Sequence, residues 1–167
     1  MSNTLSITQY TPDHRDKCAE LFNKLYSAPP FDYNWLDFDK AKQYLMDLEN
    51  TPNSLSYVLT DNNVIIGACL GQKEEHFMNP GYKINEFFIE PEHQHMGLGS
   101  FFVTVLEERL REMDMKTISL FTQRHMDSYS FYQKNDFVPN NETVHMVRII
   151  RQEPTVVYAR TFLSSEN

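Results

Sequence analysis

Residues 84–99 read INEFFIEPEHQHMGLG and combine an apolar strand, a proline-stopped turn and the start of a helix. The turn carries the pattern Gln94-x-x-Gly97-x-Gly99, whose glycines keep side chains away from the helix N-terminus. The free backbone N–H groups and the positive end of the helix dipole at such a terminus can receive phosphate oxygens. The stretch therefore predicts an enzyme that holds a pyrophosphate-bearing cofactor.

The composition indicates a globular chain. Its 167 residues fit one domain, and 41% of them are hydrophobic and 13% aromatic, which lies outside the disordered class. No apolar run approaches membrane-spanning length and the N-terminus lacks a signal-peptide pattern, so we expect a soluble cytoplasmic protein without a membrane partner. Cys18 and Cys69 form no C-x-x-C pair, and no disulfide framework is expected.

The charge balance bears on the partners. Lys and Arg number 15 against 23 Asp and Glu, which gives a formal net charge of −8. Nucleic-acid binding needs clustered basic side chains, so we expect no nucleic-acid partner. An acidic surface fits a cationic acceptor only weakly, because acidic surfaces are common and serve solubility alone.

Hydrophobic periodicity predicts the order β, α, α, three strands, α, β, α and two closing strands. This order predicts an α/β fold with a mixed sheet and helices on both faces. We expect residues 1–167 to form a single domain, with 151–167 as an extra strand and tail that either caps the sheet or pairs with a second subunit. The expected elements are a strand from Leu5, helices opening at Pro12 and Asp39, strands at 55–60, 64–71 and 82–89, a helix after Gly97, a strand at 117–122, a helix at 127–135 and closing strands at 137–138 and 144–150.

The glycine turn has competing interpretations. Glycine pairs precede helices in many folds, so the string alone also fits an ordinary strand–turn–helix. A Rossmann fingerprint requires the glycines at the first strand–helix turn of a parallel unit, whereas this turn lies past the middle of the chain. A Walker-type phosphate loop is excluded because G-K-[ST] is missing.

The element order and two local strings together resemble the GNAT superfamily of acyl-CoA-dependent N-acetyltransferases over about residues 5–150. One string is EFFIEPEH at 86–93 followed by the glycine turn, and the other is FYQKNDF at 131–137, similar to the family's FY-x-K-x-G-F helix end. The resemblance implies a central mixed, mostly antiparallel sheet and acetyl-CoA as cofactor. Three residues depart from the family pattern: His95 replaces a small residue, Asp136 a glycine and His125 an asparagine.

The resemblance also implies where the cofactor binds. Backbone amides at 94–100 would cradle the pyrophosphate, and the pantetheine would lie along residues 87–89 like an added strand. The residues expected at this site are Phe88, Ile89, Gln94, His95, Met96, Gly97, Leu98, Gly99, Ser100, His125 and Tyr132.

Acetyl transfer to an amine needs a proton acceptor, an oxyanion donor and a proton for the departing thiolate. By resemblance, the donor is the backbone N–H near Ile89 and the general acid is Tyr132, which could alternatively be a core tyrosine. Glu86 is the candidate base, acting through water, because a desolvated carboxylate has a raised pKa. It could equally pair with a basic residue or shape the acceptor site.

The acceptor is expected to lie against the segment APPFDYNWLDF at 28–38, one wall of the acceptor pocket in the family. Aromatic faces and carboxylates attract cationic amines. His93 and His95 have no third obvious ligand, so no metal site is predicted. The expected substrate-binding residues are Phe31, Asp32, Tyr33, Trp35 and Asn85.

These features together predict an acetyl-CoA-dependent N-acetyltransferase that acetylates a primary amine of a small molecule by direct attack in a ternary complex. The segment around Trp35 and Lys40-Ala41-x-x-Tyr44-Leu45 looks like aminoglycoside-type members. A protein or peptide N-acetyltransferase and a non-catalytic acyl-CoA-binding sensor are the alternatives. A homodimer is one arrangement that the final segment would permit.

Overall fold

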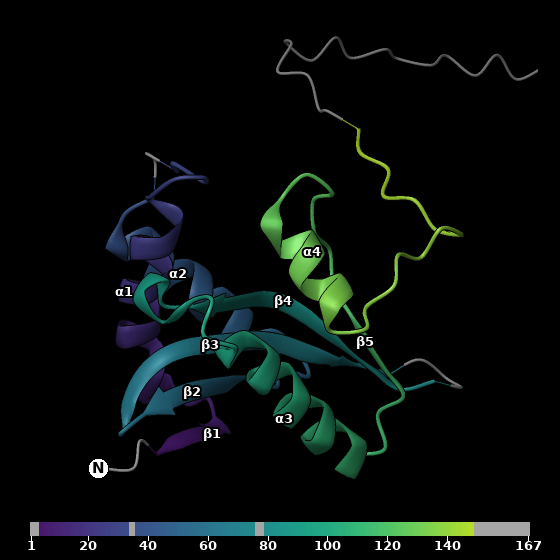
Figure 1. Cartoon of the computed structure of the whole chain (residues 1–167), viewed down its shortest axis with the longest axis horizontal. Helices are drawn as coiled ribbons and strands as arrows, with labels where there is room; N and C mark the ends of the chain where they lie inside the picture. The colour runs from purple at the N-terminus through teal and green to yellow at the C-terminus, as the bar shows by residue number, and fades with distance from the viewer. Residues whose placement is uncertain (1–3, 34–35, 76–78, 149–167) are drawn as a thin grey trace, which may run out of the picture. The chain divides into compact units, whose positions relative to one another are not determined.

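The computed structural model describes residues 4–33, 36–75 and 79–148, in which five strands form one sheet (Figure 1). The first four strands pair as antiparallel neighbours in chain order, and the fifth adds to β4 in parallel. This confirms the predicted mixed, mostly antiparallel sheet. The strands are β1 (Leu5–Gln9), β2 (Tyr57–Asp61), β3 (Val64–Glu74), β4 (Gly81–Ile89) and β5 (Thr117–Ser119).

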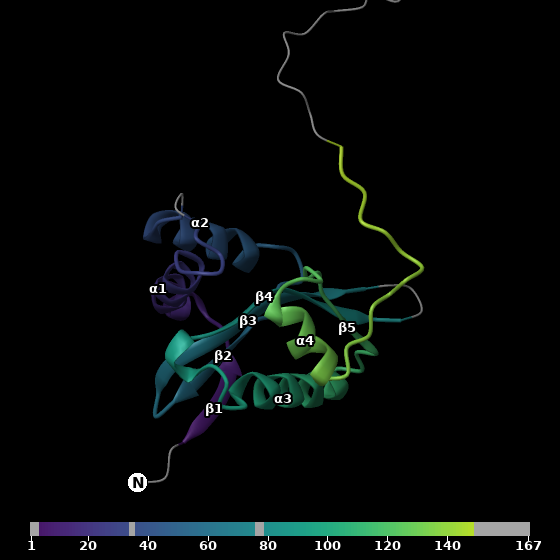
Figure 2. The same cartoon turned by 45° about the horizontal axis from the view of Figure 1, so that its top comes forward.

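Helices cover both faces of this sheet (Figure 2). α1 (Arg15–Tyr26) and α2 (Phe38–Glu49) lie on one face, where their apolar sides bury Val58 and Phe88. α3 (Leu98–Glu112) packs on the other face over Tyr82, and α4 (Asp127–Lys134) follows β5. Two short 3-10 turns, η1 (Pro12–His14) and η2 (Pro91–His93), complete the elements. Among the described residues, no helix combines the length and apolar character that crossing a membrane requires.

A bulge in β4 changes which face its side chains reach. Ile84 lies opposite Gly71 of β3, whereas Glu86 lies opposite Leu70, so β4 holds one extra residue, Asn85. An extra residue breaks the strict alternation of a strand and re-aims the side chains that follow. Ile84 accordingly belongs to the core under α3, while Glu86 turns to the face covered by α1 and α2.

The sheet opens along the second half of β4. β5 pairs with β4 only over residues 81–83, and it ends at Ser119 rather than at the predicted residue 122. Residues 84–89 therefore have no neighbouring strand on the β5 side within the described part of the chain. Apart from Ile89 O, which accepts from the Gln94 side chain, their main-chain groups on that side are available to a ligand that lies along the strand.

The predicted closing strands at 137–138 and 144–150 are wrong as far as the chain is described. Residues 138–148 contain neither helix nor strand, and Val144 and Met146 expose 80% and 85% of their surface. A β-rich pattern becomes a strand only where a partner buries one face, and none does so here. The chain divides into Met1–Phe137 and Val138–Asn167. The single-domain expectation stays a prediction, and residues 151–167 lie outside the described ones.

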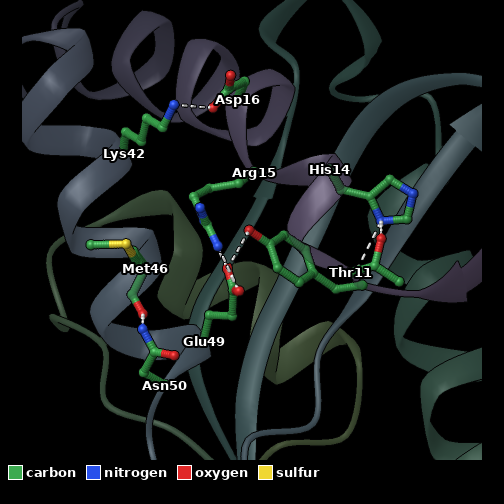
Figure 3. Close-up of polar contacts among 9 residues, drawn as sticks. Thr11, His14, Arg15, Asp16, Lys42, Met46, Glu49 and Asn50 are labelled. Atoms are coloured by element: carbon green, nitrogen blue, oxygen red, sulfur yellow. Dashed lines mark hydrogen bonds and ion pairs between the residues drawn. The ribbon is translucent and has the colours of Figure 1, made fainter.

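A partly buried ion pair connects α1 to α2 (Figure 3). The guanidinium of Arg15 donates to both carboxylate oxygens of Glu49, at 2.9 and 2.7 Å, and Tyr10 Oη donates to the same carboxylate at 3.4 Å. The side chains of Arg15 and Glu49 are only 21% and 16% exposed. Lys42 and Asp16 also link the two helices, at 2.7 Å, but are 39% and 64% exposed. The two-point contact of Arg15 should contribute more to stability.

Arg15→Met should lower the free energy of unfolding by about 1.5–3 kcal/mol, because hydrogen bonds to a charged group are lost and Glu49 keeps only Tyr10 as its donor. Lys42→Met removes an exposed pair between the same helices and should change it by less than about 0.5 kcal/mol. Urea denaturation of both variants measures the two values. Equal losses would contradict the ranking.

Candidate active site

The turn before α3 presents unpaired main-chain donors. The first helical hydrogen bond runs from Phe101 N to the carbonyl oxygen of Gly97 at 3.0 Å. The N–H groups of residues 98–100 therefore have no acceptor within the helix. Gly97 caps the helix with φ +80° and an open space around it, so its left-handed conformation brings no Cβ near this turn. The turn can receive an anion at the helix N-terminus.

Two departures from the family pattern occur where the backbone is left-handed. His95 has φ +60° in the turn, and Asp136 has φ +64° just after α4. Both conformations favour glycine, the residue the family prefers at 136. Aspartate tolerates positive φ better than most residues, so Asp136 can take the place of that glycine. His95 accepts the same backbone strain, and its side chain is exposed.

Gly99 brings the two resembling strings into contact. A Cβ at this position would approach the ring of Phe131 in α4 to 3.0 Å. Phe131 in turn stacks on Phe87 of β4, with ring centroids 5.8 Å apart. The start of α3, the middle of α4 and the open half of β4 therefore meet at one place.

The main chain of Ile89 faces the open side of the sheet. Glu90 N donates to Ile66 O of β3 at 2.7 Å. Successive peptide groups of a strand point to opposite sides, so the N–H and C=O of Ile89 point away from β3. Gln94 Nε2 donates to Ile89 O at 2.9 Å, which agrees with that direction. The N–H of Ile89 is thus directed to the region that β5 leaves open.

Glu86 is held by two tyrosines that the sequence analysis did not assign to the site. Tyr26 Oη donates to Glu86 Oε2 at 3.0 Å, and Tyr44 Oη donates to Oε1 at 2.6 Å. Burial raises the pKa of the Glu86 carboxyl above its ordinary value, and the two hydroxyl donors oppose that rise. Tyr26 and Tyr44 lie 60 and 42 residues away in the chain, so no local pattern could identify them.

Tyr132 lies on α4 in an aromatic cluster. Its ring meets Phe87 edge-on at 6.5 Å and Phe137 at 5.3 Å. Burial, followed by the electrostatic effects of Cys69 and Glu86, raises the pKa of the Tyr132 hydroxyl. The hydroxyl is therefore protonated at neutral pH. The packing fits the core role of this tyrosine as well as the acid role.

Part of the predicted acceptor wall lies beside Tyr26. The rings of Tyr26 and Tyr33 stack at 5.8 Å with an interplanar angle of 5°, and Phe31 packs on Tyr26 at 4.6 Å. Asp32, between them, is exposed and has φ +49°. Trp35 lies outside the described residues.

The remaining predicted residues are spread around the site. Phe88 is buried against Phe22 of α1, at 5.7 Å between rings, and does not reach the open side. Asn85 Nδ2 donates to Gln72 Oε1 at 3.2 Å. His125 is exposed in the turn before α4.

Within the described ranges, no three His, Cys, Asp or Glu side chains gather as a metal ion would require. Along the turn, Met96 and Ser100 are exposed and Leu98 is partly buried.

Comparison with known proteins decides the family. The family model described as "Acetyltransferase (GNAT) family" matches residues 16–137. The chain belongs to the GNAT acetyltransferase family. It is an N-acetyltransferase, of a family that uses acetyl-CoA. A search of curated proteins gave no match.

Solved structures share this acetyltransferase's fold. A possible acetyltransferase from Clostridium difficile 630 has a TM-score of 0.72 at 12% identity, over 88% of this chain and 99% of its own. An aminoglycoside acetyltransferase from an uncultured soil metagenomic sample, in complex with sisomicin, has a TM-score of 0.67 at 17% identity, over 88% of this chain and 97% of its own. An aminoglycoside N-acetyltransferase in complex with CoA has a TM-score of 0.67 at 13% identity, over 91% of this chain and 97% of its own. At these identities the likeness establishes the fold alone.

Glu86→Gln should change how stability depends on pH. Because the Glu86 pKa is raised in the folded state, folding favours the protonated carboxyl, and the wild type loses stability as pH rises from the ordinary value of 4.5 through the raised one. The neutral amide of the variant does not titrate, so it makes no pH-dependent contribution to stability. Urea denaturation at a series of pH values should therefore show the free energy of unfolding of the wild type falling relative to that of the variant as pH rises. A constant difference would contradict the raised pKa.

Proposed function

We propose that this acetyltransferase moves the acetyl group of acetyl-CoA to a primary amine of a small molecule, by direct attack in a ternary complex. One observation carries the proposal: a carboxylate, Glu86, and a phenol, Tyr132, both lie at the open half of β4. The Glu86 side chain extends to α1 and α2, and Tyr132 packs against Phe87. A proton acceptor and a proton donor thus lie at one strand segment that has no neighbouring strand on one side within the described residues.

The chain's own groups fit the shape and charge of acetyl-CoA. The N–H groups of residues 98–100 and the positive end of α3 suit a diphosphate. The unpaired side of residues 84–89 suits the two amides of a pantetheine arm, which could bind as an added strand does. When bound, acetyl-CoA supplies an activated acyl thioester.

Each of three groups then has a defined task. Glu86 accepts a proton from the acceptor ammonium, through a water molecule, which leaves the amine lone pair free to attack the acyl carbon. The N–H of Ile89 donates to the oxygen on which negative charge develops, and one such donor is worth about 10²–10³ in rate. Tyr132 Oη gives its proton to the departing sulfur as the carbon–sulfur bond breaks. The second proton of the attacking nitrogen leaves as the amide forms and restores the phenol of Tyr132. Holding the two reactants together supplies much of the acceleration.

A panel of amines with acetyl-CoA, followed by the release of free thiol, tests the function. The panel should include monoamines, polyamines, an aminoglycoside such as sisomicin, and a peptide with a free N-terminus. Turnover with a small amine supports the proposal. Turnover with the peptide alone indicates a peptide N-acetyltransferase, and binding of acetyl-CoA without turnover on any amine indicates a sensor.

Tyr132→Phe should lower kcat at least about tenfold, because general acid–base groups contribute roughly 10²–10⁴ and water replaces part of this loss. The affinity for acetyl-CoA, measured by calorimetry, should stay nearly unchanged, because the ring still packs on Phe87 and Phe137. Tyr129→Phe, on the same helix, is the matched control and should keep wild-type kcat. An unchanged kcat in Tyr132→Phe would contradict the role of Tyr132 as general acid and would indicate that this tyrosine only packs in the core.

A further inference from the structure

We propose that Tyr26 and Tyr44 are positioning residues, which hold the Glu86 carboxylate in place as the binding point for the ammonium group of the acceptor. The inference rests on the proposed function, since it assigns a task within the same site. It adds two residues from two different helices to the acceptor site, and it gives the acceptor a stated charge.

The two hydroxyls fix both oxygens of the carboxylate. Tyr26 from α1 bonds Oε2 at 3.0 Å and Tyr44 from α2 bonds Oε1 at 2.6 Å, so rotation about the terminal bond of Glu86 would break both contacts. An ionised carboxylate offers about four lone-pair positions. Two of them remain for a water molecule or an N–H donor. The two tyrosine hydroxyls, which together we call the clamp, therefore fix the direction of the remaining lone pairs and leave them free to accept further hydrogen bonds.

The tyrosines are themselves held by ring packing. Tyr26 packs on Phe22 at 4.4 Å and stacks on Tyr33, so its hydroxyl cannot swing away freely. Tyr44 packs on Phe22 at 5.5 Å and is 38% exposed, which puts it at the solvent side of the carboxylate. A single ring, that of Phe22, thus supports both donors. The precision of the clamp depends on the spacing between α1 and α2.

The charges around Glu86 leave room for a cation. The groups that face it are Tyr26 from α1 and Tyr44 from α2, which donate to it, and Tyr132 from α4, whose pKa the negative charge of Glu86 helps to raise. In the described part of the chain no Lys, Arg or His forms an ion pair with Glu86, and all three of these groups are neutral phenols at neutral pH. A partly buried carboxylate without a counter-charge is costly, and a bound ammonium lowers that cost. The acceptor is therefore expected to bind as its ammonium form.

Tyr26→Phe and Tyr44→Phe test the clamp through the pH dependence of kcat/KM. Each variant removes a hydrogen bond to the ionised carboxylate, so the acidic limb should move to higher pH, and the double variant should move it further. Below that limb, kcat/KM should fall by up to about tenfold for each hydroxyl. Near the plateau at higher pH, the loss should be smaller.

Tyr10→Phe is the matched control. It also removes a phenol-to-glutamate hydrogen bond that reaches α2, but its acceptor is Glu49, which Arg15 already pairs. It should cost some stability and leave the acidic limb in place. A limb that moves equally in Tyr10→Phe, or that stays in place in both test variants, would overturn the proposal.

A second readout does not need turnover. Carbon-13 NMR of carboxyl-labelled glutamate, with the Glu86 signal assigned by its loss in Glu86→Gln, reports the pKa of this carboxyl directly. The signal should titrate at higher pH in both test variants than in the wild type or Tyr10→Phe. Unchanged titration overturns the clamp even if the enzyme is active, whereas absence of turnover on every amine overturns the proposed function alone.

Discussion

The separation of β5 from β4 after residue 83 is the constraint on which the rest of the site depends. β5 begins parallel to β4 and ends after three residues, so among the described residues one side of 84–89 has no neighbouring strand. Backbone N–H and C=O groups require partners, so an open strand edge inside a fold binds something that resembles a strand. The N-terminus of α3 lies next along the chain and offers its own unpaired N–H groups. Contacts of Phe131 with Gly99 and with Phe87 bring these two sets of main-chain groups to the same part of the fold.

The bulge at Asn85 gives this surface its chemistry. Strict alternation would place Glu86 on the same face as Ile84, in the apolar core beneath α3. The extra residue sends Glu86 to α1 and α2 instead, where Tyr26 and Tyr44 bind it. Phe87 then faces α4, where its ring packs against the rings of Phe131 and Tyr132. One irregular step in β4 therefore sends the carboxylate of Glu86 to α1 and α2 and the ring of Phe87 to α4, which holds Tyr132.

Much of this fold could be predicted because its signals are local. The hairpin at 61–63, the helix after Gly97 and the left-handed Asp136 follow from the turn residues and from the periodicity around them. The two hydrogen bonds that hold Glu86 could not be predicted, because Tyr26 and Tyr44 lie 60 and 42 positions away from it in the chain. They also depend on the bulge at Asn85, for which the sequence offers no turn residue as a signal. The prediction of closing strands at 137–138 and 144–150 was wrong, as far as the chain is described, for a related reason: alternating apolar residues do not show which strand, if any, will pair with them. Tyr132 could be singled out only through the resemblance of its helix, since packing alone makes it a core residue.

Amide hydrogen exchange with and without acetyl-CoA tests the central claim most directly. In the free protein, the amides of residues 84–89 that face away from β3, Ile89 among them, and those of 98–100 should exchange faster than the paired amides of β3, because they have no acceptor. Saturating acetyl-CoA should slow both groups together. Protection of these amides in the free protein, or protection by acetyl-CoA elsewhere while both segments stay unchanged, would contradict the account.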